Sequence, residues 1–192
     1  MTSAQWSQDV YLKAWHYATR YHHGQTYGGA EPQEQIDYLN HVGSVVMEVI
    51  HALADAPEVN GDLAVQCALL HDVIEDTPVT YEMLKAEFGL DVADGVLALT
   101  KDTSLPHKAD QMADSLARIR RQPREVWMVK LADRITNLYY PPFYWTPARM
   151  ESYRQEAIII YDALHSAHAG LAMRLSERIK RYRQFVAAHE KD

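Results

Sequence analysis

Apolar side chains recur at intervals of three or four residues along most of the chain, which is the spacing of amphipathic helices. This pattern predicts helices over residues 5–22, 42–53, 63–76, 80–88, 92–100, 108–121, 123–135, 146–165 and 170–188. No segment alternates between apolar and polar positions as a half-buried strand does, and the sequence shows no internal repeat. We therefore expect an all-α fold of about eight or nine helices, in a single domain over residues 1–192.

Capping residues mark several of these helix boundaries. Thr80 is expected to cap the N-terminus of one helix, and Gly89 to follow its C-terminus. Asp91 is expected to cap the next helix, and Thr146 with Pro147 to open the helix that starts there. Residues 22–38 lack the helical pattern and contain three glycines, so they are predicted to form a loop of a length that is often functional.

Composition and charge narrow the class of protein. Lys and Arg total 19 and Asp and Glu total 26, which gives a formal net charge of −7. Proteins that bind nucleic acids or anionic membranes are usually basic, so we expect neither partner. Cys67 is the only cysteine, which excludes an intrachain disulfide and suits a reducing compartment. The sequence shows neither a membrane-spanning run nor a signal-peptide pattern, so we expect a cytoplasmic protein.

The end of the third predicted helix carries an unusual group of ionisable side chains. His71, Asp72, Glu75 and Asp76 lie within an arc of about 140° at about 100° per residue, directly after apolar turns. A solvated helix end is the simplest interpretation of any one of them. A buried helix that ends in a histidine and three carboxylates, however, needs something to neutralise them. Imidazole and carboxylate together suit Mn²⁺, Fe²⁺, Co²⁺ or Zn²⁺, so the group predicts a divalent metal site.

Two further segments offer ligands for the same metal. His41 opens the second helix, where a histidine is otherwise a capping or core residue. Asp133 shares a helix face with Lys130 and Asn137, because the three are spaced three and four residues apart. An isolated aspartate on a helix is usually only solvated. The order His, His-Asp, Asp, each at the edge of an apolar helix, is much less expected by chance than any of its parts.

This order resembles the HD metal-dependent phosphohydrolase superfamily, whose core is a helical bundle. More narrowly, the chain resembles the hydrolase domain of RelA/SpoT-type stringent-response enzymes and the stand-alone small alarmone hydrolases. The resemblance extends over residues 10–164. It rests on His22-His23-Gly24-Gln25, Tyr38-Leu39-Asn40-His41, Ala68 through Thr77, Phe88-Gly89, and Val129 through Arg134 with Asn137.

The resemblance implies an activity and roles for individual residues. It implies a Mn²⁺-dependent hydrolase that removes the 3′-pyrophosphate from (p)ppGpp-like alarmone nucleotides, with a small nucleotide as its substrate. The implied metal ligands are His41, His71, Asp72 and Asp133, and the implied catalytic pair is Glu75 and Asp76. The candidate substrate contacts are Asn137, Tyr27, Lys130, Arg149 and Tyr153. Either His107 or Lys108 is a further candidate for contact with a phosphate.

One departure from the family leaves the substrate open. The family usually has an Arg-Lys pair after its His-x-Gly-Gln segment, but this chain has residues 26–29, which are uncharged, and then Glu31 and Glu34. Tyr27 is expected either to stack on a base or to pack within its loop. The substrate is then a guanosine or adenosine alarmone, or another phosphorylated nucleotide. The alternatives are a phosphatase that releases orthophosphate, a non-catalytic nucleotide sensor, and a purely structural helical protein.

Overall fold

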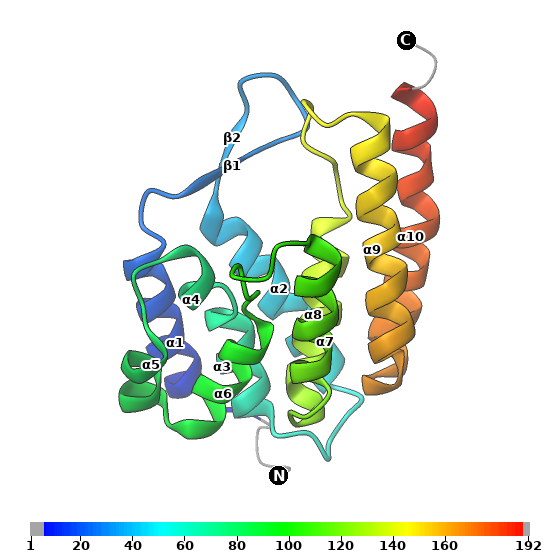
Figure 1. Ribbon diagram of the computed structural model, residues 1–192. Helices are drawn as coiled ribbons and strands as arrows, with labels where there is room; N and C mark the ends of the chain where they lie inside the picture. Colours follow the sequence, from blue (N-terminus) through cyan, green and yellow to red (C-terminus); the bar gives the residue numbers. More distant parts are fainter. Residues whose placement is uncertain (1–5, 190–192) are drawn as a thin grey trace.

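The computed structural model describes residues 6–189, and it confirms the all-α fold (Figure 1). The helices in order are α1 (Gln8–Tyr21), α2 (Tyr38–Leu53), α3 (Gly61–Leu70), α4 (Val73–Asp76), α5 (Tyr81–Phe88), α6 (Leu90–Leu99), α7 (Lys108–Ile119), α8 (Arg124–Asn137), α9 (Pro147–Leu164), the 3₁₀ turn η1 (His165–Ala167) and α10 (Ala169–His189). Among these described helices, none is long and apolar enough to cross a membrane.

Several predicted helix ends are confirmed by their capping geometry. The Thr80 side chain accepts a hydrogen bond from the Met83 N–H at 3.3 Å, and Gly89 follows α5 with a φ of 88°. The Thr146 side chain accepts one from the Arg149 N–H at 3.2 Å, directly before α9. The predicted cap by Asp91 is wrong, because α6 begins at Leu90 and the residue before it, Gly89, offers no side chain.

Two further expectations need correction. The predicted helix over residues 63–76 is two helices, because α3 ends at Leu70 and α4 begins at Val73, with ψ at 0° in Asp72 between them. The predicted loop over residues 22–38 contains strands β1 (Thr26–Gly28) and β2 (Gln35–Asp37), paired antiparallel with Tyr27 opposite Ile36. Strands of three residues are too short to show alternation in the sequence.

Helices α2, α3 and α8 pack against one another and form the centre of the molecule (Figure 1). Helix α3 is apolar on nearly every side, and its residues from Leu63 to Leu70 are buried except Gln66. Helices α9 and α10 lie side by side and cover one flank of this centre, where α10 contacts α8. Helix α1 packs on α3 from the opposite flank. This arrangement brings the ends of α2, α3 and α8 together.

The hairpin β1–β2 meets the loop before α9 above these helix ends (Figure 1). The Phe143 N–H donates a hydrogen bond to the Gly29 carbonyl at 3.2 Å. Gly28 lies so close to the Tyr144 ring that a Cβ there would be 3.1 Å from a ring carbon. The close approach explains a glycine at this position. Two segments that are far apart in sequence are thereby joined over one end of the bundle.

Candidate active site

The four predicted metal ligands converge where α2, α3 and α8 meet. His41 lies in the first turn of α2, His71 and Asp72 follow the end of α3, and Asp133 lies in the last turns of α8. The two Nε2 atoms of His41 and His71 are 3.2 Å apart. Asp72 Oδ2 is 2.9 Å from His71 Nε2 and 3.7 Å from His41 Nε2. Asp133 Oδ1 is 3.5 Å and 4.0 Å from the same two nitrogens. Both carboxylates therefore lie close to the same pair of histidine nitrogens.

The spacing of these atoms fits a divalent cation. With bonds of about 2.1 Å, the ligand atoms of an octahedral ion lie about 3.0 Å apart when adjacent and about 4.2 Å apart when opposite. The separations given above, from 2.9 to 4.0 Å, fall within or at the edge of this interval. His41, His71 and Asp133 also form a group whose ligand atoms all lie within 4.8 Å of one another. The residues present thus fit a metal held by His41, His71 and Asp133, and Asp72 lies outside this group but beside it, 2.9 Å from His71 Nε2.

Hydrogen bonds behind the histidines orient both rings toward the same point. His71 Nδ1 lies 2.8 Å from the Ala68 carbonyl, which can only accept, so this nitrogen carries the proton. The Thr136 hydroxyl donates to the Asp133 carbonyl at 2.9 Å and lies 3.3 Å from His41 Nδ1, from which it accepts. Both Nε2 atoms then face inward, 3.2 Å apart, where each can bind a metal ion or a proton.

Charge at the cluster also favours a cation. Burial raises the pKa of Asp72, but His71 and His41 outweigh it and hold that pKa well below its usual range. Burial likewise raises the pKa of Asp133, whereas Lys130 and His71 lower it more. Burial lowers the pKa of His71, yet Asp72 and Asp133 raise it to about 9. Both carboxylates are therefore ionised at neutral pH, and a metal competes with a proton at His71.

The buried carboxylate of Asp133 is held at both of its oxygens. Oδ1, which faces the histidines, accepts a hydrogen bond from Asn137 Nδ2 at 2.5 Å. Oδ2 lies 3.0 Å from Lys130 Nζ, and the side chains of both residues are buried. Lys130 and Asn137 were predicted to contact substrate; the structure places a donor of each on Asp133, and both residues line the cavity.

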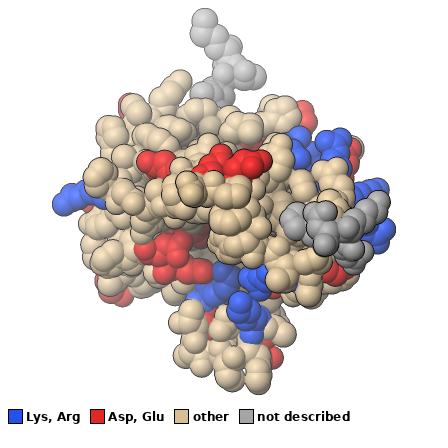
Figure 2. Space-filling view, turned by 90° about the horizontal axis from the view of Figure 1, so that it is seen from above, with Lys and Arg blue, Asp and Glu red and all other residues tan. Residues whose placement is uncertain are grey.

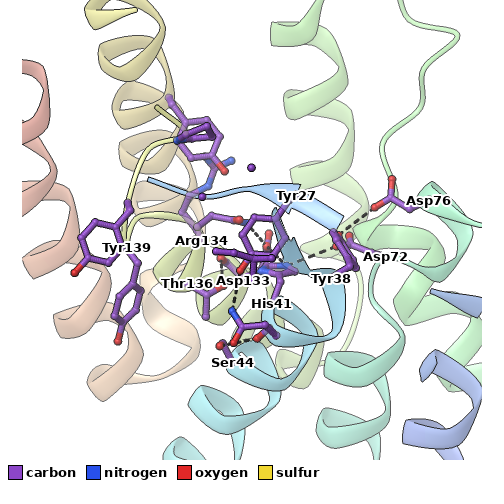
Figure 3. Close-up of a pocket in the computed structure, with 18 of the residues that line it drawn as sticks. Tyr27, Tyr38, His41, Ser44, Asp72, Asp76, Asp133, Arg134, Thr136 and Tyr139 are labelled. Carbon is purple, nitrogen blue, oxygen red and sulfur yellow. Dashed lines mark hydrogen bonds and ion pairs between the residues drawn. The ribbon is translucent and has the colours of Figure 1, made fainter. Parts of the chain in front are cut away.

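Asp76 lies next to the cluster and is tied to it by Tyr38, which the sequence did not single out. The Tyr38 hydroxyl donates to Asp72 Oδ2 through a short hydrogen bond and to Asp76 Oδ2 at 3.1 Å (Figure 3). Burial and the charge of Asp72 raise the pKa of Asp76, and the hydrogen bond from Tyr38 lowers it. Gln25 Nε2 donates to the Asp76 carbonyl at 2.7 Å and braces its backbone. Asp76 is thus an exposed carboxylate beside the ligand cluster, with a raised pKa.

Glu75, the other predicted catalytic residue, has a different environment. Its Oε1 lies 2.7 Å from Lys101 Nζ, and its Oε2 accepts the Lys101 backbone N–H at 3.0 Å. Burial lowers the pKa of Lys101, but Glu75 raises it by more, so the lysine stays charged. The break after α3 accounts for this position, since Glu75 is no longer on a continuous helix with His71. Lys101 follows α6 and was not predicted as a site residue.

The cluster forms part of the wall of a cavity of about 1090 Å³, which is large enough for a nucleotide with two phosphate chains. Charged side chains of opposite sign gather in adjoining groups on the face that carries the hairpin (Figure 2). The aromatic part of the cavity wall consists of Tyr27, Tyr38, Tyr139, Tyr140, Tyr144, Trp145 and Tyr153, and the cationic part of Lys101, Lys108, Lys130, Arg134 and Arg149.

The remaining predicted substrate contacts fall on this wall. Tyr27 accepts a hydrogen bond from Asn40 Nδ2 at 2.8 Å and packs edge-on against Tyr38, with its ring at the cavity. The Arg149 guanidinium lies 4.9 Å from the centre of the Trp145 ring. Tyr153 packs on the same Trp145 ring, and all three side chains line the cavity. Of the two loop candidates, Lys108 lines the cavity and His107 is not among its lining residues.

Comparison with known proteins gives one family model and several relatives. The model of the HD domain matches residues 14–172. The chain is 30% identical over 175 residues to a zebrafish (Danio rerio) protein named guanosine-3′,5′-bis(diphosphate) 3′-pyrophosphohydrolase MESH1, which covers 89% of this chain and 93% of that one. It is 38% identical over 122 residues to the guanosine-3′,5′-bis(diphosphate) 3′-pyrophosphohydrolase of Haemophilus influenzae, across 61% of this chain and 16% of that protein.

The fold of this chain also matches that of a solved structure. It is described as a metazoan ortholog of SpoT that hydrolyses ppGpp and has a role in starvation responses. It matches this chain with a TM-score of 0.76 at 28% sequence identity, over 93% of this chain and 98% of that one. The resemblance inferred from the motifs is therefore confirmed.

Proposed function

Because this chain belongs to the HD domain family, we propose that it is a divalent-metal-dependent pyrophosphohydrolase acting on guanosine-3′,5′-bis(diphosphate) or its adenosine counterpart. It removes the 3′-pyrophosphate and leaves the nucleoside 5′-diphosphate, or the triphosphate when the substrate carries three 5′-phosphates. The observation that carries the proposal is the metal-sized group of His41, His71 and Asp133, with Asp72 beside it, on the wall of a nucleotide-sized cavity that Asp76 also lines. The names of the relatives support the substrate class.

The proposed metal is Mn²⁺, held by His41, His71, Asp72 and Asp133. Imidazole and carboxylate suit Mn²⁺ among several first-row metals, and four protein ligands leave open positions on an octahedral ion. When bound, such an ion supplies Lewis acidity that lowers the pKa of water and offsets the charge of the phosphate. Two carboxylates and two neutral imidazoles give the site a charge that a divalent cation balances.

Asp76 is the proposed general base. Its carboxylate takes a proton from the attacking water while the water oxygen bonds to the phosphorus attached to the 3′ oxygen; the bond from that phosphorus to the 3′ oxygen breaks, and the 3′ oxygen takes a proton from solvent to leave as a hydroxyl. The raised pKa of Asp76 makes it a better proton acceptor than an ordinary aspartate, and Tyr38 fixes its orientation. Glu75 holds Lys101 at the cavity, where the ammonium offsets charge on the substrate.

The wall of the cavity suggests how the nucleotide lies. The aromatic side chains, including Tyr27 and Tyr153, offer faces for the base without adding charge. Arg149 and Lys108 supply cations for the phosphate chains. Asn137 uses its amide N–H on Asp133, which leaves its amide oxygen to accept a hydrogen bond from a sugar hydroxyl.

The test is incubation of the purified protein with Mn²⁺ and either ppGpp or ppApp, with products separated by ion-exchange chromatography. Pyrophosphate is the expected product, and orthophosphate instead would indicate a general nucleotide phosphatase. Binding of both nucleotides with no turnover would indicate a sensor, and absence of metal and nucleotide binding would leave a structural protein. Asp76→Ala is expected to keep the metal and lose turnover, because Asp76 is not among the four ligands.

A further inference from the structure

Lys130 has an unusual position for a residue on the wall of an anion-binding cavity. It lies one turn before Asp133 on α8, and its side chain is buried to nearly the same extent as that of Asp133. Its ammonium lies 3.0 Å from Asp133 Oδ2, the oxygen that faces away from the two histidines, whereas Oδ1 faces them and accepts from Asn137. Each oxygen of this one carboxylate therefore has its own partner.

We propose that Lys130 is a positioning residue that keeps Asp133 a one-oxygen metal ligand and so preserves the open coordination positions that the reaction needs. The proposal rests on the proposed function in one respect, which is that a metal binds at the four ligands. It assigns Lys130 a role different from the substrate contact expected from the sequence.

The chemistry of carboxylates makes such control necessary. Aspartate binds metal ions through one oxygen or through both. In a divalent site with flexible geometry, neither mode is strongly favoured by the metal itself. If Asp133 used both oxygens, the protein would supply five ligand atoms, leaving an octahedral ion one position in place of two. The attacking water and a phosphate oxygen would then compete for that position.

Lys130 opposes the two-oxygen mode in two ways. Its ammonium donates to Oδ2 at 3.0 Å, so a metal would have to compete with this hydrogen bond for that oxygen. Its charge also repels a cation that moves toward Oδ2, and this repulsion is strong because both side chains are buried. A lysine that only stabilised the helix would have neither effect, because it would not sit on the free oxygen of a ligand.

Lys130→Met and Lys130→Gln separate the possible roles. Methionine has a similar length and neither charge nor donor, whereas the glutamine amide keeps a donor for Oδ2. Lys101→Met is the matched control, since Lys101 also lines the cavity and pairs with a carboxylate, that of Glu75, outside the ligand set. The measurements are the dissociation constant for Mn²⁺ and the enhancement of water-proton relaxation by bound Mn²⁺, which counts metal-bound waters.

In Lys130→Met, we expect Mn²⁺ to bind at least as tightly as in the wild type and the relaxation enhancement to fall by about half, because Oδ2 replaces one of two waters. Lys130→Gln and Lys101→Met are expected to keep the wild-type enhancement. With ppGpp as substrate, kcat of Lys130→Met should fall at least about ten-fold with little change in KM. The relaxation result stands even if neither ppGpp nor ppApp is hydrolysed.

Other outcomes overturn the proposal. An unchanged relaxation enhancement with a raised KM would make Lys130 a substrate contact, and a loss of Mn²⁺ affinity in Lys130→Met would make it a purely structural partner of Asp133. If Lys130→Met does not fold, the crystal structure of the Mn²⁺-loaded wild type shows whether Asp133 binds the metal through one oxygen or through both. It should show Asp133 bound through Oδ1 alone with Lys130 on Oδ2, and coordination through both oxygens would refute the inference.

Discussion

Replacing Tyr38 by phenylalanine removes the single hydroxyl that joins Asp72 to Asp76 and leaves the ring in place. The hydroxyl donates to both carboxylates, and its hydrogen bond lowers the pKa of Asp76 against the effects of burial and of the Asp72 charge, which raise it. The substitution should therefore raise the pKa of Asp76 further. Because a general base works only when ionised, the acidic limb of the kcat–pH profile should move to higher pH.

The size of the shift follows from the geometry. A hydrogen bond to a charged group contributes about 1.5–3 kcal/mol, and here one proton is shared between two acceptors, of which Asp76 is the more distant at 3.1 Å. Assigning Asp76 about half of this energy gives about 0.7–1.5 kcal/mol, which corresponds to a shift of about 0.5–1 pH unit.

The assay is the kcat–pH profile of wild type and Tyr38→Phe with saturating ppGpp, at two concentrations of Mn²⁺. A limb that moves with the Mn²⁺ concentration reports loss of metal and not protonation of Asp76. Tyr81→Phe is the matched control, because it also removes a tyrosine–aspartate hydrogen bond, to Asp94 at 2.7 Å, outside the cavity. If Tyr38→Phe stays active with its acidic limb at the wild-type pH, the assignment of Asp76 as the base is refuted.

Three further predictions concern stability and metal binding. Gly95→Ala should lower the free energy of unfolding by about 1–3 kcal/mol in urea titrations, because the new Cβ would lie 2.8 Å from Cys67 Sγ; unchanged stability would contradict the close packing. Arg174→Ala should cost about 2–3 kcal/mol by the same method, since it leaves the buried Glu48 carboxylate unpaired, and adding Glu48→Gln should restore part of the loss. The pKa of His71 is raised to about 9 without metal, so the Mn²⁺ affinity measured by calorimetry should fall as the pH drops from 9 to 6, and a constant affinity would exclude His71 as a ligand.

The sequence identified the ligand cluster because each ligand type interrupts an apolar helical pattern. His41, His71, Asp72 and Asp133 stand at the edges of three helices that the pattern predicts to be buried, and these edges meet in the structure. Glu75 lines the same cavity as His71, Asp72 and Asp76, as predicted, but the continuous helix from residue 63 to residue 76 on which that prediction rested is absent. The chain breaks that helix between Leu70 and Val73, a local choice that no residue type in the segment signals.

The sequence pattern could not predict side-chain hydrogen bonds that depend on how the helices pack together. Tyr38 lies three residues before His41, so the helical period puts both on one face, but its link to Asp72 and Asp76 depends on how α2 meets α3. Lys101 reaches Glu75 across the end of α6, from 26 residues further along the chain. The sequence pattern did not predict the hairpin because its strands span only three residues each.

The proposed metal ligands come from three helices that pack directly on one another, so the spacing of the ligand atoms depends on the packing of the core. A core substitution that rolls α2 or α8 by a few tenths of an ångström changes the separation of His41 from Asp133, now 3.5 Å. Proteins transmit such shifts because their interiors are closely packed. Substitutions far from the cavity that shift the helix interfaces should therefore change metal preference before they abolish folding.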